Sequence, residues 1–326
     1  MTATNRFQES RDRGLAYLLE QQGPRGEFPA NAPEVADYYK PLTAFQVCGR
    51  NDAAHRLCRW IRKYGFSAEG DFGPRSPSAG ADSYAYAYFN SWLVLGAHRL
   101  GQFDLSFKGM EFILSFYDSE SGGFYSSQGE RGGDTEQDLM VVSMCGLAAL
   151  QTGHLDVAQN AGGWLRSLLE AQPDFPNRLY TVYSQTDGLQ TTPPPGEELR
   201  YLVIGDATED QAFFNPGIAA AFLTRLFQVT AEEPWLETAK EYMRFAENAS
   251  DFLFRLVRAG KVGWAAALLY TATGETKYRD IAVRIGDNLI DLQSPSGWWS
   301  GVGSTTPSHD STAERVIWMD EISQAV

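Results

Sequence analysis

The feature that most constrains this chain is a repeated alternation between two kinds of helical segment. Apolar, small-residue-rich segments begin near Glu34, Asp82, Asp134, Glu209, Val257 and Asp310. Each of the first five is followed by a short turn and a segment whose apolar residues recur at i, i+3, i+4 and i+7, with charges between them. A helix that is apolar on all sides belongs to an inner layer, whereas an amphipathic helix keeps one face in water. The sequence therefore predicts five inner–outer helical pairs.

The two ends of the chain supply a sixth pair. Residues 5–22 form an outer-type segment with no inner partner before it, and residues 310–325 form an inner-type segment with no outer partner after it. Pairing them closes a ring with a repeat of about fifty residues, a length typical of helical repeat proteins. We predict an all-α fold, an (α/α)6 barrel or toroid of six helical hairpins, that spans residues 1–326 as a single domain.

One segment interrupts the helical period. Residues 177–207 contain strand-like runs at 179–185 and 199–205, separated by turn residues and three consecutive prolines. We predict a β-hairpin-like insertion, a flap between the third and fourth helical hairpins. It lies on the face where the inner helices begin, so we expect it to act as a lid.

The outer segments share a second motif. "RGLAYLLEQQGPRGEF" (13–28) has Gln22 followed by G-x-F, and "RIGDNLIDLQSPSGWW" (284–299) has Gln293 followed by G-x-W. "KGMEFILSFYDSESGGF" (108–124) has Tyr117 in place of the glutamine. These segments resemble the QW motif of the squalene cyclase and protein prenyltransferase superfamily, [KR]-G-x2-[FYW]-L-x3-Q followed by G-x-W. The resemblance spans most of the chain and implies a toroid whose Gln and aromatic residues cap the outer helices and tie neighbouring turns together. It predicts a fold more than a function, because toroids with this motif catalyse unrelated reactions.

Carboxylates recur where the inner segments begin. They occur in "EVADYYK" (34–40), "ADSYAYAYFNSW" (81–92), "DTEQD" (134–138), "DATEDQ" (206–211) and "SHDSTAER" (308–315). N-capping explains one acid per helix, and Thr135–Asp138 and Thr208–Gln211 have the spacing of a capping box. It explains less well why acids accumulate beside so many aromatic residues. In a toroid these helix starts converge on one face, so we expect an aromatic cavity with carboxylates at its rim, the general form of a small-molecule site.

Carboxylates held together in such a cavity have their pKa values pushed apart, so that one serves as acid and another as base. The candidate catalytic residues are Asp134, Glu136, Asp210, His309, Asp310, Tyr38 and Tyr84. The candidate substrate-binding residues are Tyr88, Trp92, Phe213, Trp264 and Trp318. The other three histidines, His55, His98 and His154, fall at inner-to-outer turns and are expected on the opposite face.

Several specific chemistries lack their motifs. The type II terpene cyclases of this architecture use a DxDD motif, and the nearest match here, residues 134–138, has a different spacing. We find neither the zinc ligands of protein prenyltransferases and lanthionine cyclases nor a P-loop or dinucleotide motif. A sugar 2-epimerase of this architecture needs two inner histidines, and the sequence offers one at most, His309. We therefore expect no metal and no cofactor.

Charge and composition limit the partners. The formal net charge of −14 argues against nucleic acid and anionic membranes. It also disfavours polyanionic substrates, unless a local basic pocket overrides the mean field. Three cysteines without CxxC spacing indicate buried thiols in a reducing compartment. With neither a secretory signal nor a long apolar stretch, we expect a cytoplasmic protein without a membrane span that binds a small-molecule substrate, its oligomeric state being open.

Three functions remain open. The first is a metal-independent cyclase, isomerase or lyase of terpene-cyclase-like type, in which aromatic rings stabilise cationic character on a hydrophobic or semi-polar, terpenoid- or polyketide-like metabolite. The second is a glycan-active (α/α)6 enzyme, such as an unsaturated-oligosaccharide hydrolase, that stacks sugars on rings and uses paired carboxylates. The third is a non-catalytic ligand-binding toroid. We rank them in this order on the sequence.

Overall fold

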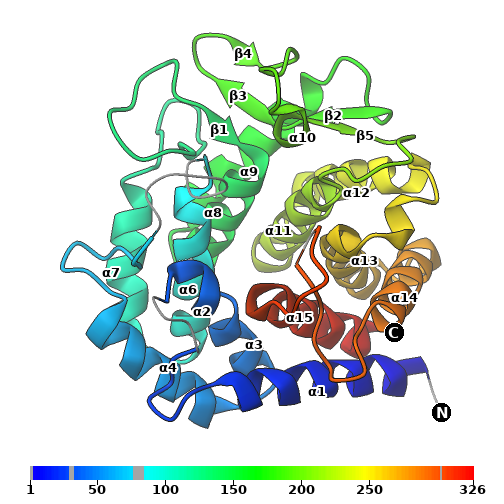
Figure 1. Cartoon of the computed structure of the whole chain (residues 1–326). Helices are drawn as coiled ribbons and strands as arrows, with labels where there is room; N and C mark the ends of the chain where they lie inside the picture. Colours follow the sequence, from blue (N-terminus) through cyan, green and yellow to red (C-terminus); the bar gives the residue numbers. More distant parts are fainter. Residues whose placement is uncertain (1–2, 29–32, 76–83, 302) are drawn as a thin grey trace.

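The chain forms a ring of helical hairpins in a computed structural model that describes residues 3–28, 33–75, 84–301 and 303–326 (Figure 1). In these residues the inner helices are α3 (Pro41–Val47), α6 (Tyr86–Arg99), α8 (Leu139–Gln151), α11 (Phe214–Thr230), α13 (Gly260–Thr273) and α15 (His309–Ala325). Each packs on the next around the ring, and α15 packs on α3. The predicted (α/α)6 toroid is confirmed.

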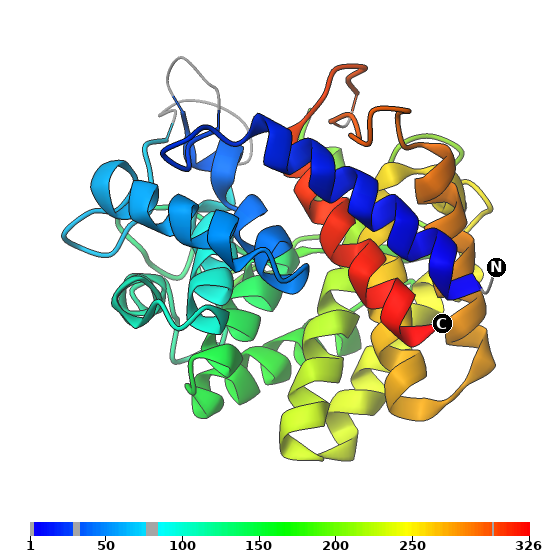
Figure 2. The same ribbon diagram turned by 90° about the horizontal axis from the view of Figure 1, so that it is seen from below.

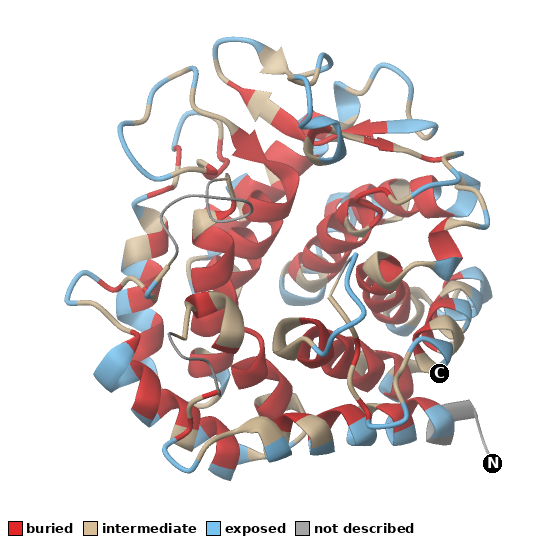
Figure 3. Ribbon diagram, in the orientation of Figure 1, coloured by how far each residue is buried: buried red, intermediate tan, exposed pale blue. Residues whose placement is uncertain are grey.

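An outer helix packs on each inner one. The outer helices are α4 (Asn51–Tyr64), α7 (Phe103–Leu114), α9 (Leu155–Glu170), α12 (Glu233–Asn248), α14 (Thr276–Asp291) and α1 (Ala3–Gln21). The inner helices are apolar all round because they are covered on all sides: every residue of α8 from Leu139 to Ala149 is buried. The outer helices bury one face and expose the other, as Figure 3 shows around the periphery.

The ring closes between the two ends of the chain. α1 lies along α15 (Figure 2), and the Arg11 guanidinium of α1 contacts the Asp320 carboxylate of α15 at 2.6 Å. The sixth pair predicted from the sequence is therefore present. No helix within the described residues is both long and apolar enough to cross a membrane.

Several inner helices begin later than the carboxylate pattern predicts. α8 begins at Leu139, with Asp138 as its N-cap accepting a bond from Met140 N at 2.9 Å. α11 begins at Phe214, and the Gln211 side chain accepts from Ile204 N instead of capping a helix. The two predicted capping boxes, Thr135–Asp138 and Thr208–Gln211, are therefore wrong.

The first and fifth inner segments are also interrupted. A short helix, α2 (Val35–Tyr38), precedes α3, because Pro41 cannot continue a helix except from its first turn. Two 3₁₀ turns, η1 (Leu253–Arg255) and η2 (Val257–Ala259), precede α13. The carboxylate predicted at Asp82, with the rest of residues 76–83, lies outside the described residues.

The insertion pairs in two sheets. β2 (Arg178–Tyr180) pairs antiparallel with β5 (Leu202–Ile204), as the two strand-like runs predict. β3 (Val182–Ser184) pairs instead with β1 (Gln137–Asp138) and with β4 (Gly188–Leu189). A short helix, α10 (Glu198–Tyr201), leads into β5. The insertion thus joins the segment that precedes α8 and fixes the backbone of Asp138.

The glutamines of the QW-like motif tie outer helices together. Gln22 Nε2 donates to Ala53 O in α4 at 3.0 Å, and Gln293 Nε2 donates to Ser10 O in α1 at 3.0 Å. Tyr117, which replaces the glutamine, accepts from Asn160 of α9 at 2.8 Å. The structural role that the motif implies is confirmed at these three places.

Candidate active site

Three adjoining pockets open on the face of the ring where the inner helices begin. The central cavity, about 340 Å³, lies at the start of the inner helices, and residues from several of these segments line it, among them Tyr39 and Trp318. The bridging pocket, about 200 Å³, includes Asp138 and Asn215, and the rim pocket, about 460 Å³, includes Glu136 and Glu197. Tyr84 lines all three, so the pockets adjoin and share walls.

The central cavity combines aromatic rings with charged groups. Its rings are Tyr39, Tyr84, Tyr88, Phe89, Phe214 and Trp318. Its charged side chains are Arg258, Lys261, Asp310, Glu314 and Arg315. Rings provide stacking surfaces and charged groups provide oriented hydrogen bonds, as expected of a site for a polar ligand with apolar faces.

Glu314 is the centre of a buried ion cluster. Its carboxylate contacts Lys261 Nζ at 2.5 Å, Lys40 Nζ at 3.0 Å and Arg315 Nη1 at 3.2 Å. Burial alone would raise the pKa of Glu314, but the three cations outweigh it and lower that pKa to about 2. Lys40 also contacts Asp310 at 2.8 Å, which extends the cluster to the cavity wall.

Two glycines place Lys261 in this cluster. A Cβ at Gly217 of α11 would lie 2.4 Å from the carbonyl carbon of Lys261, so only glycine permits α11 and α13 to approach so closely. A Cβ at Gly260 would lie 2.0 Å from the Trp318 ring. The close packing holds Lys261 Nζ between ring faces, 5.0 Å from the Phe214 centroid and 5.1 Å from that of Trp318.

Asp138 has an environment that favours its protonated form. Only 4% of the residue is exposed, and burial raises the pKa of Asp138 to about 6. The cation of Arg200, 3.6 Å from Asp138 Oδ2, and the amide of Met140 act in the opposite direction and lower this pKa. A carboxyl group balanced in this way can donate a proton near neutral pH.

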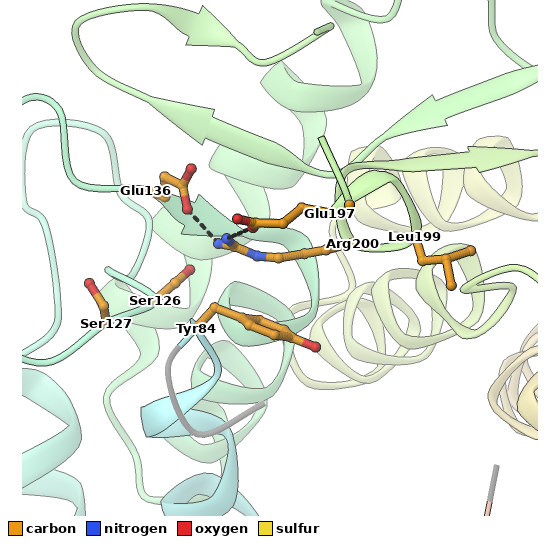
Figure 4. A pocket seen from close by; sticks show the side chains of 8 residues that line it. Tyr84, Ser126, Ser127, Glu136, Glu197, Leu199 and Arg200 are labelled. Atoms are coloured by element: carbon orange, nitrogen blue, oxygen red, sulfur yellow. Dashed lines mark hydrogen bonds and ion pairs between the residues drawn. The ribbon is translucent and has the colours of Figure 1, made fainter. Parts of the chain in front are cut away.

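The insertion delivers Arg200 to this site. In Figure 4 the Arg200 side chain extends from α10 over Tyr84, with its guanidinium 4.6 Å from the ring centroid. Arg200 contacts Glu136 at 2.6 Å and Glu197 at 3.4 Å. The Tyr201 hydroxyl also donates to Glu136. The rim carboxylate Glu136 is therefore held by two residues of the insertion.

The structure separates the predicted catalytic residues into two groups. Asp310, Glu136 and Tyr84 line the pockets. Asp210 lies just outside, where it contacts the lining residue Arg258 at 3.0 Å. Asp134 is exposed and lines none of the three pockets.

Two other predicted residues point away from the cavity. Tyr38 is fully buried, donates to Gly73 O at 2.5 Å and packs on Trp60 of the outer helix α4. His309 lies beside the Phe28 ring at a centroid distance of 4.9 Å, and burial lowers its pKa. Neither residue lines any of the three pockets.

The predicted binding residues divide similarly. Tyr88 and Trp318 line the central cavity. Trp92 and Trp264 lie deeper, in mutual ring contact at 6.4 Å, and do not line it. Phe213 is fully buried, while its neighbour Phe214 lines the cavity, an error of one residue in helical phase.

The sequence analysis missed the basic residues of the site. Lys40, Arg200, Arg258, Lys261 and Arg315 were not selected, and neither were Asp138 and Glu314 as catalytic candidates. A signal was present: Lys261 and the Glu314–Arg315 pair interrupt segments that are otherwise built for burial. A charge within such a segment needs a partner or a ligand. Within the described residues no group of three or more His, Cys, Asp or Glu side chains is placed to hold a metal ion.

No protein-family model matches the sequence, and the search of curated proteins gave no significant match. Solved structures do resemble it. A D-mannose isomerase is 13% identical and matches over 98% of this chain and 97% of that chain, with a TM-score of 0.74. A cellobiose 2-epimerase from Spirochaeta thermophila is 12% identical over 99% of both chains, with a TM-score of 0.70. An unsaturated glucuronyl hydrolase specific for heparin is 11% identical over 98% of this chain and 97% of that chain, with a TM-score of 0.65.

At these identities the likeness establishes the fold alone. All three are toroid enzymes that act on sugars, and none of them is a squalene cyclase or a prenyltransferase. The toroid that the repeat predicts is therefore supported, whereas the finer resemblance to the cyclase superfamily is not.

Proposed function

We propose that this protein is a glycan-active acid/base enzyme, a hydrolase of oligosaccharides, with Asp138 as the proton donor. The observation that carries the proposal is the buried carboxyl group of Asp138, in a pocket that adjoins an aromatic cavity with further carboxylates. Burial raises the pKa of Asp138 to about 6, so this group can hold a proton near neutral pH. A carboxyl group with a raised pKa is the usual general acid of glycoside hydrolysis, and a second, ionised carboxylate acts as base or nucleophile.

The remaining roles follow from the contacts. Asp310 lines the central cavity and, among the described residues, forms its ion pair with Lys40, so we assign it the role of base or nucleophile. Glu314 is engaged by three cations and orients them. Tyr84, shared by all three pockets, and the rings of Tyr88 and Trp318 provide the surfaces on which a sugar ring stacks.

The toroidal sugar enzymes described above support a glycan substrate over a terpenoid one. They do not favour epimerisation in particular, because none of the four histidines of this chain lines the three pockets. Proton transfer by carboxyl groups fits hydrolysis better.

The test is a turnover screen with a matched pair of variants. Wild type, Asp138→Asn and Asp134→Asn are incubated with panels of α- and β-linked oligosaccharides, neutral and acidic, and products are separated by anion-exchange chromatography. Asn is as good an N-cap as Asp, so Asp138→Asn keeps the start of α8. We expect cleavage by wild type and Asp134→Asn, and a loss of roughly 10²- to 10⁴-fold in kcat/KM for Asp138→Asn.

Other outcomes contradict the proposal. Conversion of a reducing sugar to its isomer without cleavage would indicate an isomerase. Consumption of terpenoid-like metabolites, with no effect of the sugars, would restore the cyclase hypothesis. Sugar binding without turnover would favour the non-catalytic toroid.

A further inference from the structure

The floor of the central cavity carries positive charge in a strongly acidic protein. Lys261 and Arg315 line the cavity, and Lys40 lies directly behind it. These side chains are nearly inaccessible, with 5%, 2% and 3% of each residue exposed, respectively. The chain as a whole has a net charge of −14, so the sign of the charge reverses inside the ring.

The carboxylates of the cluster do not neutralise these cations. Lys40, Lys261 and Arg315 face two carboxylates, Glu314 and Asp310, and all three converge on Glu314. Arg258, at the cavity wall, has Asp210 as its own partner. Among the described residues, three buried cations thus share two carboxylates, which leaves the cluster with one positive charge in excess.

The cluster also holds hydrogen-bond donors that no group satisfies. Arg315 donates from Nη1 to Ser311 O at 3.1 Å and from Nη2 to Val257 O at 3.2 Å. Its Nε is buried and has no hydrogen-bond partner in the part of the chain that the structure describes, and the same is true of Trp318 Nε1. Both residues line the cavity, so these unpaired donors belong to side chains that a ligand in the cavity would contact.

We propose that the substrate carries an anionic group, a carboxylate or sulfate on the sugar, that binds at the cavity floor beside Lys261 and Arg315. This inference rests on the proposed function and names its substrate class. The anion supplies the missing negative charge, while the rings of Tyr88 and Trp318 contact the sugar to which it is attached. The competing explanation is that the cluster only holds α3, α13 and α15 together.

The first experiment compares matched ligands on the Asp138→Asn protein, in which turnover is blocked. Isothermal titration calorimetry is run with three oligosaccharides of one backbone: neutral, bearing a uronic acid carboxylate, and bearing a sulfate. We expect at least one acidic ligand to bind roughly ten- to hundredfold more tightly than the neutral one, since a hydrogen bond to a charged group contributes about 1.5–3 kcal/mol. The acidic oligosaccharide that binds more tightly identifies whether the site recognises a carboxylate or a sulfate.

The second experiment tests the cations. Lys261→Met in the same background leaves Glu314 paired with Lys40 and Arg315, so the fold is expected to persist. Its matched control is Lys277→Met on the outer helix α14. We expect Lys261→Met to lose the preference for the acidic ligand while keeping its affinity for the neutral one, and Lys277→Met to change neither. If Lys261→Met does not fold, Arg315→Lys replaces it, which keeps the charge but loses the planar donor fork.

The outcomes separate this inference from the proposed function. Equal binding of neutral and acidic ligands overturns the inference and leaves the hydrolase proposal standing. A preference for acidic ligands that survives Lys261→Met, or Arg315→Lys where that variant replaces it, places the anion elsewhere and also overturns the inference. Binding of none of the three ligands counts against both proposals.

Discussion

Opposing interactions act on the pKa of the buried Asp138 carboxyl group, and their balance determines the pH range in which it can donate a proton. Burial raises its pKa to about 6, while Arg200 and two backbone amides pull that pKa down. A raised carboxyl pKa stabilises the folded state only while the group is protonated. The contribution is thus complete below the ordinary value of 3.8 and is lost as the pH rises through about 6.

Arg200→Gln is predicted to move the basic limb of the pH–activity profile to higher pH. Removing the cation takes away an influence that lowers the pKa of Asp138, so the protonated form persists to higher pH. The measurement is kcat/KM from pH 4 to 9 on a cleaved oligosaccharide. Arg178→Gln, in the same insertion but paired at the surface with Asp174, is the control and should leave the profile in place. An unchanged profile for Arg200→Gln would show that Asp138 is not the titrating acid.

At this scale the sequence predicts which face holds the site but not which side chains enter it. Aromatic residues mark the starts of the inner helices correctly, and Tyr84, Tyr88 and Trp318 do line the cavity. Phe213 and Tyr38 do not, because a helical turn of one residue rotates a side chain by about 100°. That phase depends on where each helix begins, which the carboxylates predict too early.

At the scale of elements, the predicted start of α8 lies too early in the chain because of a strand pairing. Residues 134–138 have the composition of a helix start, but the two residues before α8 pair as β1 with β3, some forty-five positions later in the chain. A long-range strand pairing of this kind leaves no local pattern in the sequence. The periodic helices themselves are predicted well, because burial on one face or all faces determines their composition.

Gln293→Ala is predicted to lower the free energy of unfolding by about 2 kcal/mol. The side chain donates to Ser10 O and Gly297 O at 3.0 and 2.8 Å and accepts from Ser10 Oγ at 2.7 Å, joining the end of α14 to α1. Urea denaturation followed by circular dichroism measures the change. Gln159→Ala, which removes a surface bond to Glu232, should cost far less. Equal changes in the free energy of unfolding for the two substitutions would mean that the hydrogen bonds of Gln293 stabilise the fold no more than a surface hydrogen bond does.

At the scale of the whole molecule, the ring has a seam where its two ends meet. α1 and α15 pack along one another, and both chain ends lie on the same side in Figures 1 and 2. Closure is thus made by packing rather than by chain connectivity. The alternation of inner and outer segments predicts this closure from sequence, because the outer-type segment 5–22 and the inner-type segment 310–325 each lack a neighbouring partner in the chain.

A circular permutant is predicted to fold. The present ends are joined by a flexible Gly/Ser linker of about ten residues, and new ends are opened at the turn between α11 and α12, where Ala231 and Glu232 are exposed. We expect a cooperative thermal transition within a few degrees of wild type by calorimetry. The control, opened between Ala266 and Ala267 inside α13, should not fold. Failure of both would show that chain continuity across the α11–α12 turn is essential to the ring.

The ion cluster at the cavity floor crosses that seam, with consequences for the order of assembly. Lys40 comes from the first inner segment, Lys261 from α13, and Glu314 from α15, which leaves the ribosome after every other helix described here. Until α15 docks, the two lysines have no shared carboxylate and the floor of the cavity does not exist. A partly synthesised chain can form its hairpins in sequence, and the bridging and rim pockets contain no residue of α15, but the central cavity gains its floor only when α15 docks.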